Sequence, residues 1–190
     1  MPTAIITGAS RGLGRALADD LGRAGWRVVA DARTAADLEA AAGNWPNAVA
    51  LAGDVTDPGH RHALVDAAGD RIDLLVLNAS SLGPSPLPPL AGYDLEALRA
   101  VLETNTVAPL ALTQLALPAV RAAGGRILAV SSDAAVEGYP GWGGYGSSKA
   151  ATAVIGAPAG DRMRSSDRSA GPRRRAGAAP ARPSPAPAGR

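Results

Sequence analysis

Segments of two kinds alternate along roughly the first 157 residues, and this alternation restricts the fold more than any other feature of the sequence. Short, almost continuously apolar runs predict buried strands, and stretches with helical periodicity lie between them. The predicted strands cover residues 3–7, 27–31, 48–51, 72–78 and 126–131. The predicted helices cover residues 13–24, 35–42, 58–68, 95–102 and 106–122, and a last helix begins near Tyr145. Such an order favours an α/β fold with a doubly wound parallel sheet.

Local signals support several of these boundaries. Asp57 and Pro58 provide an N-cap and a proline at the first helical position. Thr34 and Asp37 have the spacing of a capping box. Residues 80–92 contain four prolines, which exclude a regular helix or a central strand. We expect this segment to form a long loop over one end of the sheet.

Charge is divided unevenly along the chain. Residues 1–155 carry 11 basic and 15 acidic side chains, whereas residues 156–190 carry 8 arginines and 2 aspartates. Of the last 35 residues, 32 are Ala, Gly, Pro, Arg or Ser, so this segment has almost nothing to bury. We therefore predict one domain over residues 1–155 and a disordered basic tail over residues 156–190. Because the basic excess belongs to the tail, it does not indicate a nucleic-acid-binding protein.

Two other interpretations of the tail remain open. The run Arg173–Arg175 would suit contact with nucleic acid or an acidic surface, although a solvated tail is the simpler interpretation. Ala, Gly, Pro and Arg account for 28 of the 35 residues, and a gene rich in G and C that is read out of frame would encode this composition.

Other classes of protein are disfavoured by what the sequence lacks. The absence of cysteine excludes disulfides and thiolate metal sites, and it fits a reducing compartment. The N-terminus does not resemble a signal peptide, and the longest uncharged stretch, residues 106–120, is too short to span a bilayer. His60 and His62 are predicted to be exposed helix residues, not metal ligands. We expect a soluble cytoplasmic protein with no metal, membrane or nucleic-acid partner.

A glycine-rich turn separates the first predicted strand from the first predicted helix. In a parallel sheet this position binds phosphate, because glycine permits a tight turn and the helix N-terminus offers free N–H groups to an anion. The spacing is G-x-x-x-G-x-G, and a plain structural turn is the alternative. The residues predicted to hold a dinucleotide here are Thr7, Gly8, Ser10, Arg11, Gly12, Leu13 and Gly14.

The end of the second predicted strand bears on the choice of dinucleotide. Arg33 directly follows this strand and Arg11 lies in the glycine turn, so two cations are available for a ribose 2′-phosphate. This favours NADP(H) over NAD(H). Asp31 is a competing signal, because a carboxylate here would accept hydrogen bonds from a free 2′-hydroxyl, but we expect its side chain to point elsewhere. The alternative is that Arg33 is a solvated residue at a strand end.

Tyr145 and Lys149 lie four residues apart on the last predicted helix and so share one face. A nearby ammonium lowers the pKa of a phenol, which makes the phenol a usable general acid and base. Lys149 is the only lysine, against 18 arginines, which favours a specific role for it. Alone, such a pair is most often a surface feature.

Together, these motifs resemble those of the short-chain dehydrogenase/reductase family, which has a single Rossmann-type domain. The resemblance extends from about residue 2 to residue 151, and Ser132 lies 13 residues before Tyr145, as the family's catalytic serine does. The motifs that carry it are Thr7–Gly14, Asp54-Val55, Asn78-Ala79, Asn105, Ser131-Ser132 and Tyr145 with Lys149.

The resemblance implies a role for each matching residue. Tyr145 would exchange a proton with the oxygen of a small-molecule carbonyl or alcohol, and Ser132 would hydrogen-bond that oxygen. Lys149 would hold the nicotinamide ribose and lower the pKa of the tyrosine. Asn105 would anchor a water chain that relays protons. Asp54 would bind the adenine edge, Asn78 would help shape the ribose side of the site, and Val55 and Ala79 would also contact the cofactor.

The sequence departs from the family pattern at two places. Ser80 stands where the family has a glycine that approaches the cofactor. After residue 151 the family continues its helix and adds two strands and a lid, and we find none of these in residues 156–190. We therefore expect the fifth strand to be an exposed edge and the usual helical dimer interface to be truncated. A degenerate relative that binds NADP(H) weakly, or an interaction protein with a basic tail, remains an alternative to a working enzyme.

Overall fold

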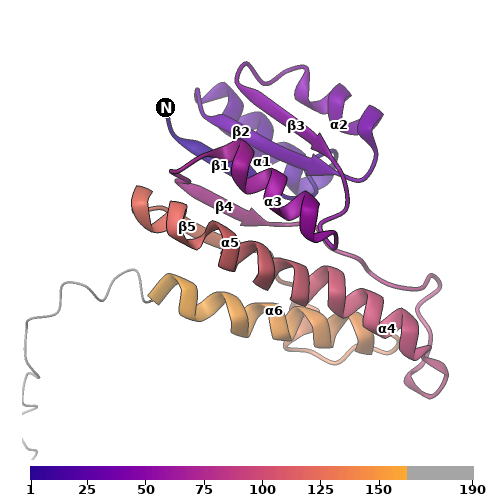
Figure 1. Cartoon of the computed structure of the whole chain (residues 1–190). Helices are drawn as coiled ribbons and strands as arrows, with labels where there is room; N and C mark the ends of the chain where they lie inside the picture. The colour runs from indigo at the N-terminus through magenta and orange to yellow at the C-terminus, as the bar shows by residue number, and fades with distance from the viewer. Residues whose placement is uncertain (162–190) are drawn as a thin grey trace, which may run out of the picture.

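The computed structural model describes residues 1–161, and its centre is a five-stranded parallel sheet in the order β3-β2-β1-β4-β5 (Figure 1). The strands are β1 (Thr3–Ile6), β2 (Arg27–Ala32), β3 (Ala48–Ala52), β4 (Leu74–Leu77) and β5 (Arg126–Ala129). In the register of the sheet, Ile5 pairs with Val29 on one side and with Leu75 on the other. The chain therefore reverses its direction of winding at β1, which confirms the predicted doubly wound sheet.

Helices join successive strands, and a last helix follows β5. They are α1 (Gly12–Arg23), α2 (Ala35–Ala42), α3 (Pro58–Ala68), α4 (Leu95–Leu102), α5 (Ala108–Ala123) and α6 (Gly143–Asp161), with short 3₁₀ turns η1 (Leu90–Gly92) and η3 (Asp133–Ala135). Asp57 caps α3 through the Gly59 amide, as predicted. Thr34 precedes α2, but its side chain makes no capping hydrogen bond, so the predicted capping box does not form.

The helix predicted over residues 106–122 does not have a separate start in the structure. A π-helical turn, η2 (Glu103–Val107), joins α4 to α5, so one continuous helical stretch runs from Leu95 to Ala123. This stretch is long and apolar enough to cross a membrane by length and composition alone. In the structure, however, Leu112 and Val120 contribute to a buried cluster beneath the sheet.

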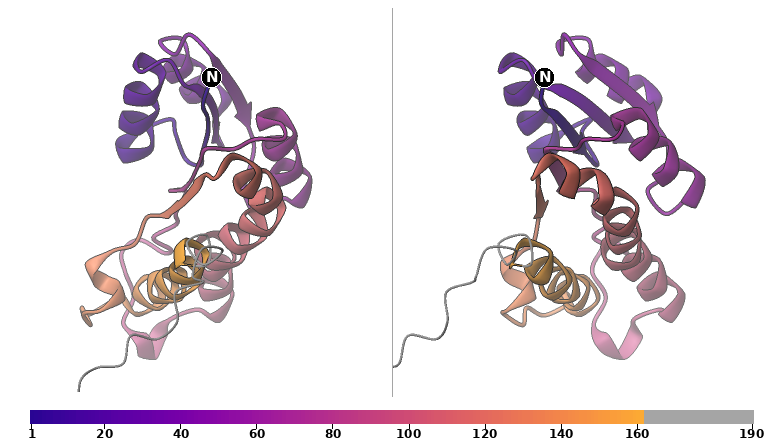
Figure 2. Two further views of the ribbon diagram at one scale, coloured as in Figure 1. Left: turned by 90° about the vertical axis from the view of Figure 1, so that its left-hand side faces the viewer. Right: turned by 60° about the vertical axis from the view of Figure 1, so that its left-hand side comes forward.

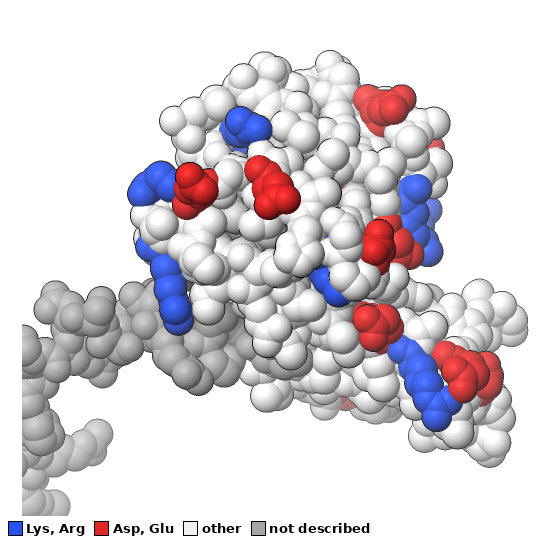
Figure 3. Space-filling view, viewed as in Figure 1, with Lys and Arg blue, Asp and Glu red and all other residues white. Residues whose placement is uncertain are grey.

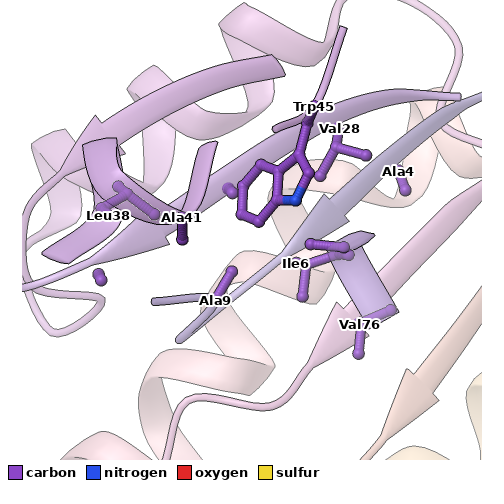
Figure 4. Packing of buried hydrophobic residues seen from close by; sticks show 11 residues of the cluster. Ala4, Ile6, Ala9, Val28, Leu38, Ala41, Trp45 and Val76 are labelled. Atoms are coloured by element: carbon purple, nitrogen blue, oxygen red, sulfur yellow. The ribbon is translucent and has the colours of Figure 1, made fainter. Parts of the chain in front are cut away.

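Side chains from alternate positions of each strand build two separate cores, as the pleat of a sheet requires. Figure 2 shows α1 and α2 on one side of the sheet and α3 and α5 on the other. On the first side Trp45 packs among Val28, Leu38 and Ala41 (Figure 4). Its indole nitrogen donates to the Asp19 carboxylate at 2.6 Å. The second core contains Ile5, Val29, Leu64, Leu75 and Leu112.

The final helix lies beside α4 and η2 (Figures 1 and 2). It extends to Asp161, six residues past the domain boundary predicted at residue 155. Residues 162–190 lie outside the described part of the chain, and the predicted disorder of the tail therefore remains a prediction there. Within the described residues β5 is an edge strand, and Leu128 on it is 46% exposed, in agreement with the expected open edge.

Candidate coenzyme and active site

The glycine turn after β1 adopts a conformation that requires glycine. Gly8 and Gly12 have φ values of +67° and +58°, in the left-handed region. A Cβ on Gly8 would lie 3.0 Å from the Cα of Ala79, whereas a Cβ on Gly12 would meet no atom within 4 Å. The backbone at Gly12 therefore borders open space. Gly14 has a packing role, because a Cβ there would overlap the Gly8 carbonyl oxygen and Nδ2 of Asn78.

Hydrogen bonds hold this turn against the end of β4. The Thr7 hydroxyl oxygen accepts from the backbone amides of Asn78 and Ala79, both at 3.0 Å. Nδ2 of Asn78 donates to the carbonyl oxygens of Thr7 and Gly8, at 2.9 and 3.1 Å. Thr7 is only 3% exposed. Thr7, and Gly14 by its packing, therefore shape the site from beneath, whereas Asn78 both supports the turn and borders the space above it.

That space is a cavity of about 580 Å³ at the carboxyl ends of β1, β2, β3 and β4. It lies at the point where the strand order reverses, which is where open α/β sheets bind dinucleotides. Ten of the predicted cofactor-binding residues line it: Gly8, Ser10, Arg11, Gly12, Leu13, Arg33, Asp54, Val55, Asn78 and Ala79. The cavity also takes in Ser80, Ser81 and Thr104, which were not predicted as binding residues. Its volume is in the usual range for ligand sites.

The wall of the cavity carries both signs of charge. Arg11 and Arg33 are exposed and line it from α1 and from the end of β2. No side chain caps the start of α1, so its first amide groups remain available to an anion. Hydrogen bonds from Thr56, first from its amide at 2.9 Å, hold the pKa of Asp54 below its ordinary value, and the charges of Arg33 and His60 add to this.

Asp31 lines the cavity, but its side chain is only 2% exposed because both carboxylate oxygens are engaged within the protein. One carboxylate oxygen accepts from the Gly8 amide at 2.6 Å, and the other lies 3.1 Å from Nε2 of His60. His60 is only 9% exposed, so the prediction that it is an exposed helix residue is wrong, whereas His62 is exposed. The reason is a long-range pairing: Gly53 leaves room for the His60 ring, and the Asp31 carboxylate compensates for its burial.

The second group of predicted residues gathers around α6. Lys149 is 3% exposed, and its Nζ donates to the Val130 carbonyl at 2.9 Å, just beyond β5. The same Nζ lies 5.7 Å from the ring centroid of Tyr145, so the two side chains share one face, as predicted. Burial lowers the pKa of Lys149. Tyr145 also packs edge-to-face on Trp142.

Ser132 caps the 3₁₀ turn η3. Its hydroxyl accepts from the Ala134 amide at 3.2 Å and donates to the Asp133 carboxylate at 2.9 Å. The Ser132 and Tyr139 hydroxyls and the Ala134 amide lower the pKa of Asp133, with the Ser132 hydrogen bond as the largest cause. The hydroxyl proton of Ser132 is therefore directed at Asp133, and a substrate oxygen must compete for it.

Asn105 sits at the centre of a buried network in η2 and is 1% exposed. Nδ2 donates to the Ser81 carbonyl and to the Ser148 hydroxyl, at 2.8 and 2.9 Å, while Oδ1 accepts from the Ser81 amide at 2.7 Å and from the Ser80 hydroxyl at 3.2 Å. The Thr152 hydroxyl donates to the backbone carbonyl of Asn105. Asn105 thus joins the loop after β4 to α6, and the predicted water relay stays a prediction.

The predicted residues of the glycine turn and those around α6 do not line one common cavity. Tyr145, Lys149 and Ser132 do not line the 580 Å³ cavity. A separate hollow of about 290 Å³ beside Trp142 and Tyr139 lies between η3 and α6. Within residues 1–161, no group of three or more His, Cys, Asp or Glu side chains is arranged to hold a metal ion. Sequence reasoning missed Ser148 and Thr152, although their spacing from Tyr145 places them on the same helix face.

Comparison with known proteins identifies relatives of the whole described region. The family model described as "short chain dehydrogenase" matches residues 2–160. The "Short chain dehydrogenase asqE" of Emericella nidulans is 34% identical over 163 residues, 78% of this chain and 60% of that protein. "D-erythrulose reductase" of Gallus gallus is 39% identical over 133 residues, 69% of this chain and 52% of that protein.

A solved structure agrees with these matches. A metagenomic short-chain oxidoreductase in complex with NADP has a TM-score of 0.78 at 31% sequence identity, over 86% of this chain and 76% of that one. The present chain spans about 60% or less of the length of the two relatives named above. The match nevertheless includes the glycine turn, the Asn105 network and the Tyr145–Lys149 face. The chain belongs to the short-chain dehydrogenase/reductase family of oxidoreductases.

Proposed function

We propose that this protein binds NADP(H) in the 580 Å³ cavity and interconverts a small-molecule carbonyl compound and the corresponding alcohol. The observation that carries the proposal is the cavity wall. It combines an open backbone at Gly12, the uncapped start of α1, and two exposed arginines, Arg11 and Arg33. This combination suits a dinucleotide with a third phosphate, because backbone amides accommodate the diphosphate and guanidinium groups pair with a 2′-phosphate. The NADP complex of a structural relative supports the choice.

The residues around α6 supply the proton chemistry in this proposal. The nicotinamide, when bound, would supply or accept the hydride. Tyr145 transfers a proton from its hydroxyl to the substrate oxygen in reduction and takes it back in oxidation. The Lys149 ammonium lies 5.7 Å from the centroid of the Tyr145 ring. Ser132 donates to the same substrate oxygen after its hydroxyl leaves Asp133.

Coenzyme titration tests the binding part of the proposal. Fluorescence titration should show tighter binding of NADPH than of NADH. Arg33→Asp should weaken NADPH binding by about ten-fold or more, since it removes a charge-assisted hydrogen bond, and should leave NADH binding nearly unchanged. Arg121→Asp changes the charge equally at an exposed position outside the cavity and serves as the matched control. Unchanged NADPH affinity in Arg33→Asp would refute the choice of coenzyme.

A second candidate function is coenzyme binding with little turnover. It is favoured by the separation of the two groups, because Tyr145 and Lys149 do not line the cavity and Nζ of Lys149 is engaged by the Val130 carbonyl. A chain of this kind would bind NADPH yet fail to oxidise it with any member of a broad panel of ketones and aldehydes. Carbonyl-dependent oxidation of NADPH would exclude this candidate.

A further inference from the structure

The His60–Asp31 pair lies directly beneath the coenzyme cavity, and the proposed chemistry does not use it. Asp31 stands at the end of β2, where an acidic side chain can accept hydrogen bonds from a ribose 2′-hydroxyl. Its side chain is nevertheless 2% exposed, because the Gly8 amide of the turn occupies one oxygen and His60 of α3 occupies the other. The carboxylate therefore borders the cavity but does not present itself to a ligand.

The direction of the Asp31 side chain follows from the pleat of β2. Val29 and Asp31 are two residues apart and point to the same face of the sheet, the face that α3 covers. Val29 belongs to the core on that side, together with Leu64 of α3. His60, in the first turn of α3, meets Asp31 from the same side. Gly53 permits this approach, because any Cβ there would overlap the imidazole ring.

We propose that His60 is a positioning residue that sets coenzyme preference by holding Asp31 under the glycine turn. This inference rests on the proposed function. A carboxylate oxygen can only accept, so Nε2 of His60 must carry the proton in the 3.1 Å contact. With its charge compensated by this donor and by the Gly8 amide, Asp31 neither binds a ribose hydroxyl nor repels a 2′-phosphate. Arg33 then governs recognition at the end of β2.

Removing His60 should shift preference toward NADH. In His60→Ala one Asp31 oxygen loses its donor, so the negative charge at the border of the cavity is compensated by the Gly8 amide alone. The ratio of the dissociation constants for NADH and NADPH should fall about five-fold, the effect of about one hydrogen bond. His60→Gln, which retains a side-chain N–H donor, should keep the wild-type ratio. Adding Asp31→Asn to His60→Ala should restore the wild-type ratio, because the double variant has no negative charge at residue 31. His62→Ala, an exposed change in the same helix, is the matched control.

A measurement without coenzyme tests the pair itself. The chain has two histidines, so their ring nitrogens can be assigned by NMR, with His62 as the internal reference. His60 should carry a proton on Nε2, and its ring signals should shift in Asp31→Asn while those of His62 do not. A His60 ring protonated only on Nδ1 would overturn the proposal, whether or not the variants fold.

The outcomes separate this inference from the proposed function. A wild-type chain that prefers NADPH, with an unchanged ratio in folded His60→Ala, contradicts the role of His60 alone. If His60→Ala binds both coenzymes more weakly by the same factor, the role of His60 in preference is also contradicted. That result would indicate that His60 only supports the structure of the turn. A wild-type chain that binds neither coenzyme contradicts the proposed function and this inference together.

Discussion

At the residue scale, the coenzyme cavity depends on side chains that are small or absent. Gly12 leaves the approach to the start of α1 open, and Gly14 lets α1 pack against the Gly8 carbonyl and Asn78. In the proposed function, Arg11 and Arg33 of the cavity wall would contribute specificity only because the backbone beneath them has this shape. The proposed coenzyme binding would therefore depend on some of the residues that stabilise the turn.

Gly14→Ala should destabilise the protein by about 1–3 kcal/mol, because the added methyl group must displace backbone at Gly8 or the amide of Asn78. Gly43→Ala is the control: its φ is −57°, and the new Cβ would lie 3.6 Å from the Glu39 carbonyl oxygen. We expect that change to stay within about 0.5 kcal/mol of the wild type. Chemical denaturation measures both. Equal stabilities of the two variants would contradict the packing role of Gly14.

Lys149→Met should remove a pH-dependent component of stability. Burial lowers the pKa of Lys149 below its ordinary value of 10.5, so the unfolded chain binds more protons in the window between the two values. Stability from this group is therefore fully present above pH 10.5 and is lost as pH falls through the lowered pKa. Between the lowered pKa and pH 10.5, the free energy of unfolding of the wild type should contain a component that rises with pH. Denaturation of Lys149→Met should lack this component. Parallel curves would show that Lys149 is not desolvated.

At the element scale, Asn105 is one of several polar residues that attach α6 to the rest of the domain. Asn105 lies in the π-helical turn between α4 and α5 and bonds to the loop after β4 and to Ser148 of α6. A π turn inserts an extra residue into the helix and so changes which side chains face α6. The Tyr145–Lys149 face therefore owes its position to η2 as well as to β5.

Asn105→Ala should destabilise the protein by about 2–4 kcal/mol, since it leaves buried polar groups of the β4 loop and of α6 without partners. Amide hydrogen exchange in residues 143–154 should accelerate more than in β1 or β2. Asn44→Ala, at an exposed position after α2, should change neither property. An Asn105→Ala protein with wild-type exchange in α6 would show that this network does not hold the helix.

Sequence patterns predicted the elements of this domain more accurately than the contacts between them. The central strands β1, β2 and β4 were found because their apolar runs are buried on both faces, and α3 because Asp57 and Pro58 mark its start. The π turn at Asn105 has no local signature, so two separate helices were predicted, over residues 95–102 and 106–122, with Asn105 between them. His60 was misplaced because its burial depends on Asp31, which is 29 residues away in sequence.

At the scale of the whole molecule, the described residues form one sheet with a cavity at the carboxyl ends of β1 to β4 and a Tyr–Lys helix that follows β5. On the face shown in Figure 3, acidic and basic side chains lie interspersed over residues 1–161. This mixture agrees with the 11 basic and 15 acidic side chains of residues 1–155. The account rests on cooperation between the cavity and the helix during hydride transfer.

Carbonyl-dependent oxidation of NADPH by the wild type and by Tyr145→Phe, with NADPH affinity measured on the same samples, tests this claim most directly. We predict measurable turnover by the wild type and a kcat lower by about 100-fold or more in Tyr145→Phe, since the proton donor is lost. NADPH affinity should be retained, and Tyr139→Phe, the matched control on the neighbouring loop, should keep its turnover. Wild-type turnover by Tyr145→Phe, or NADPH binding by the wild type with no turnover on any carbonyl compound, would contradict the account.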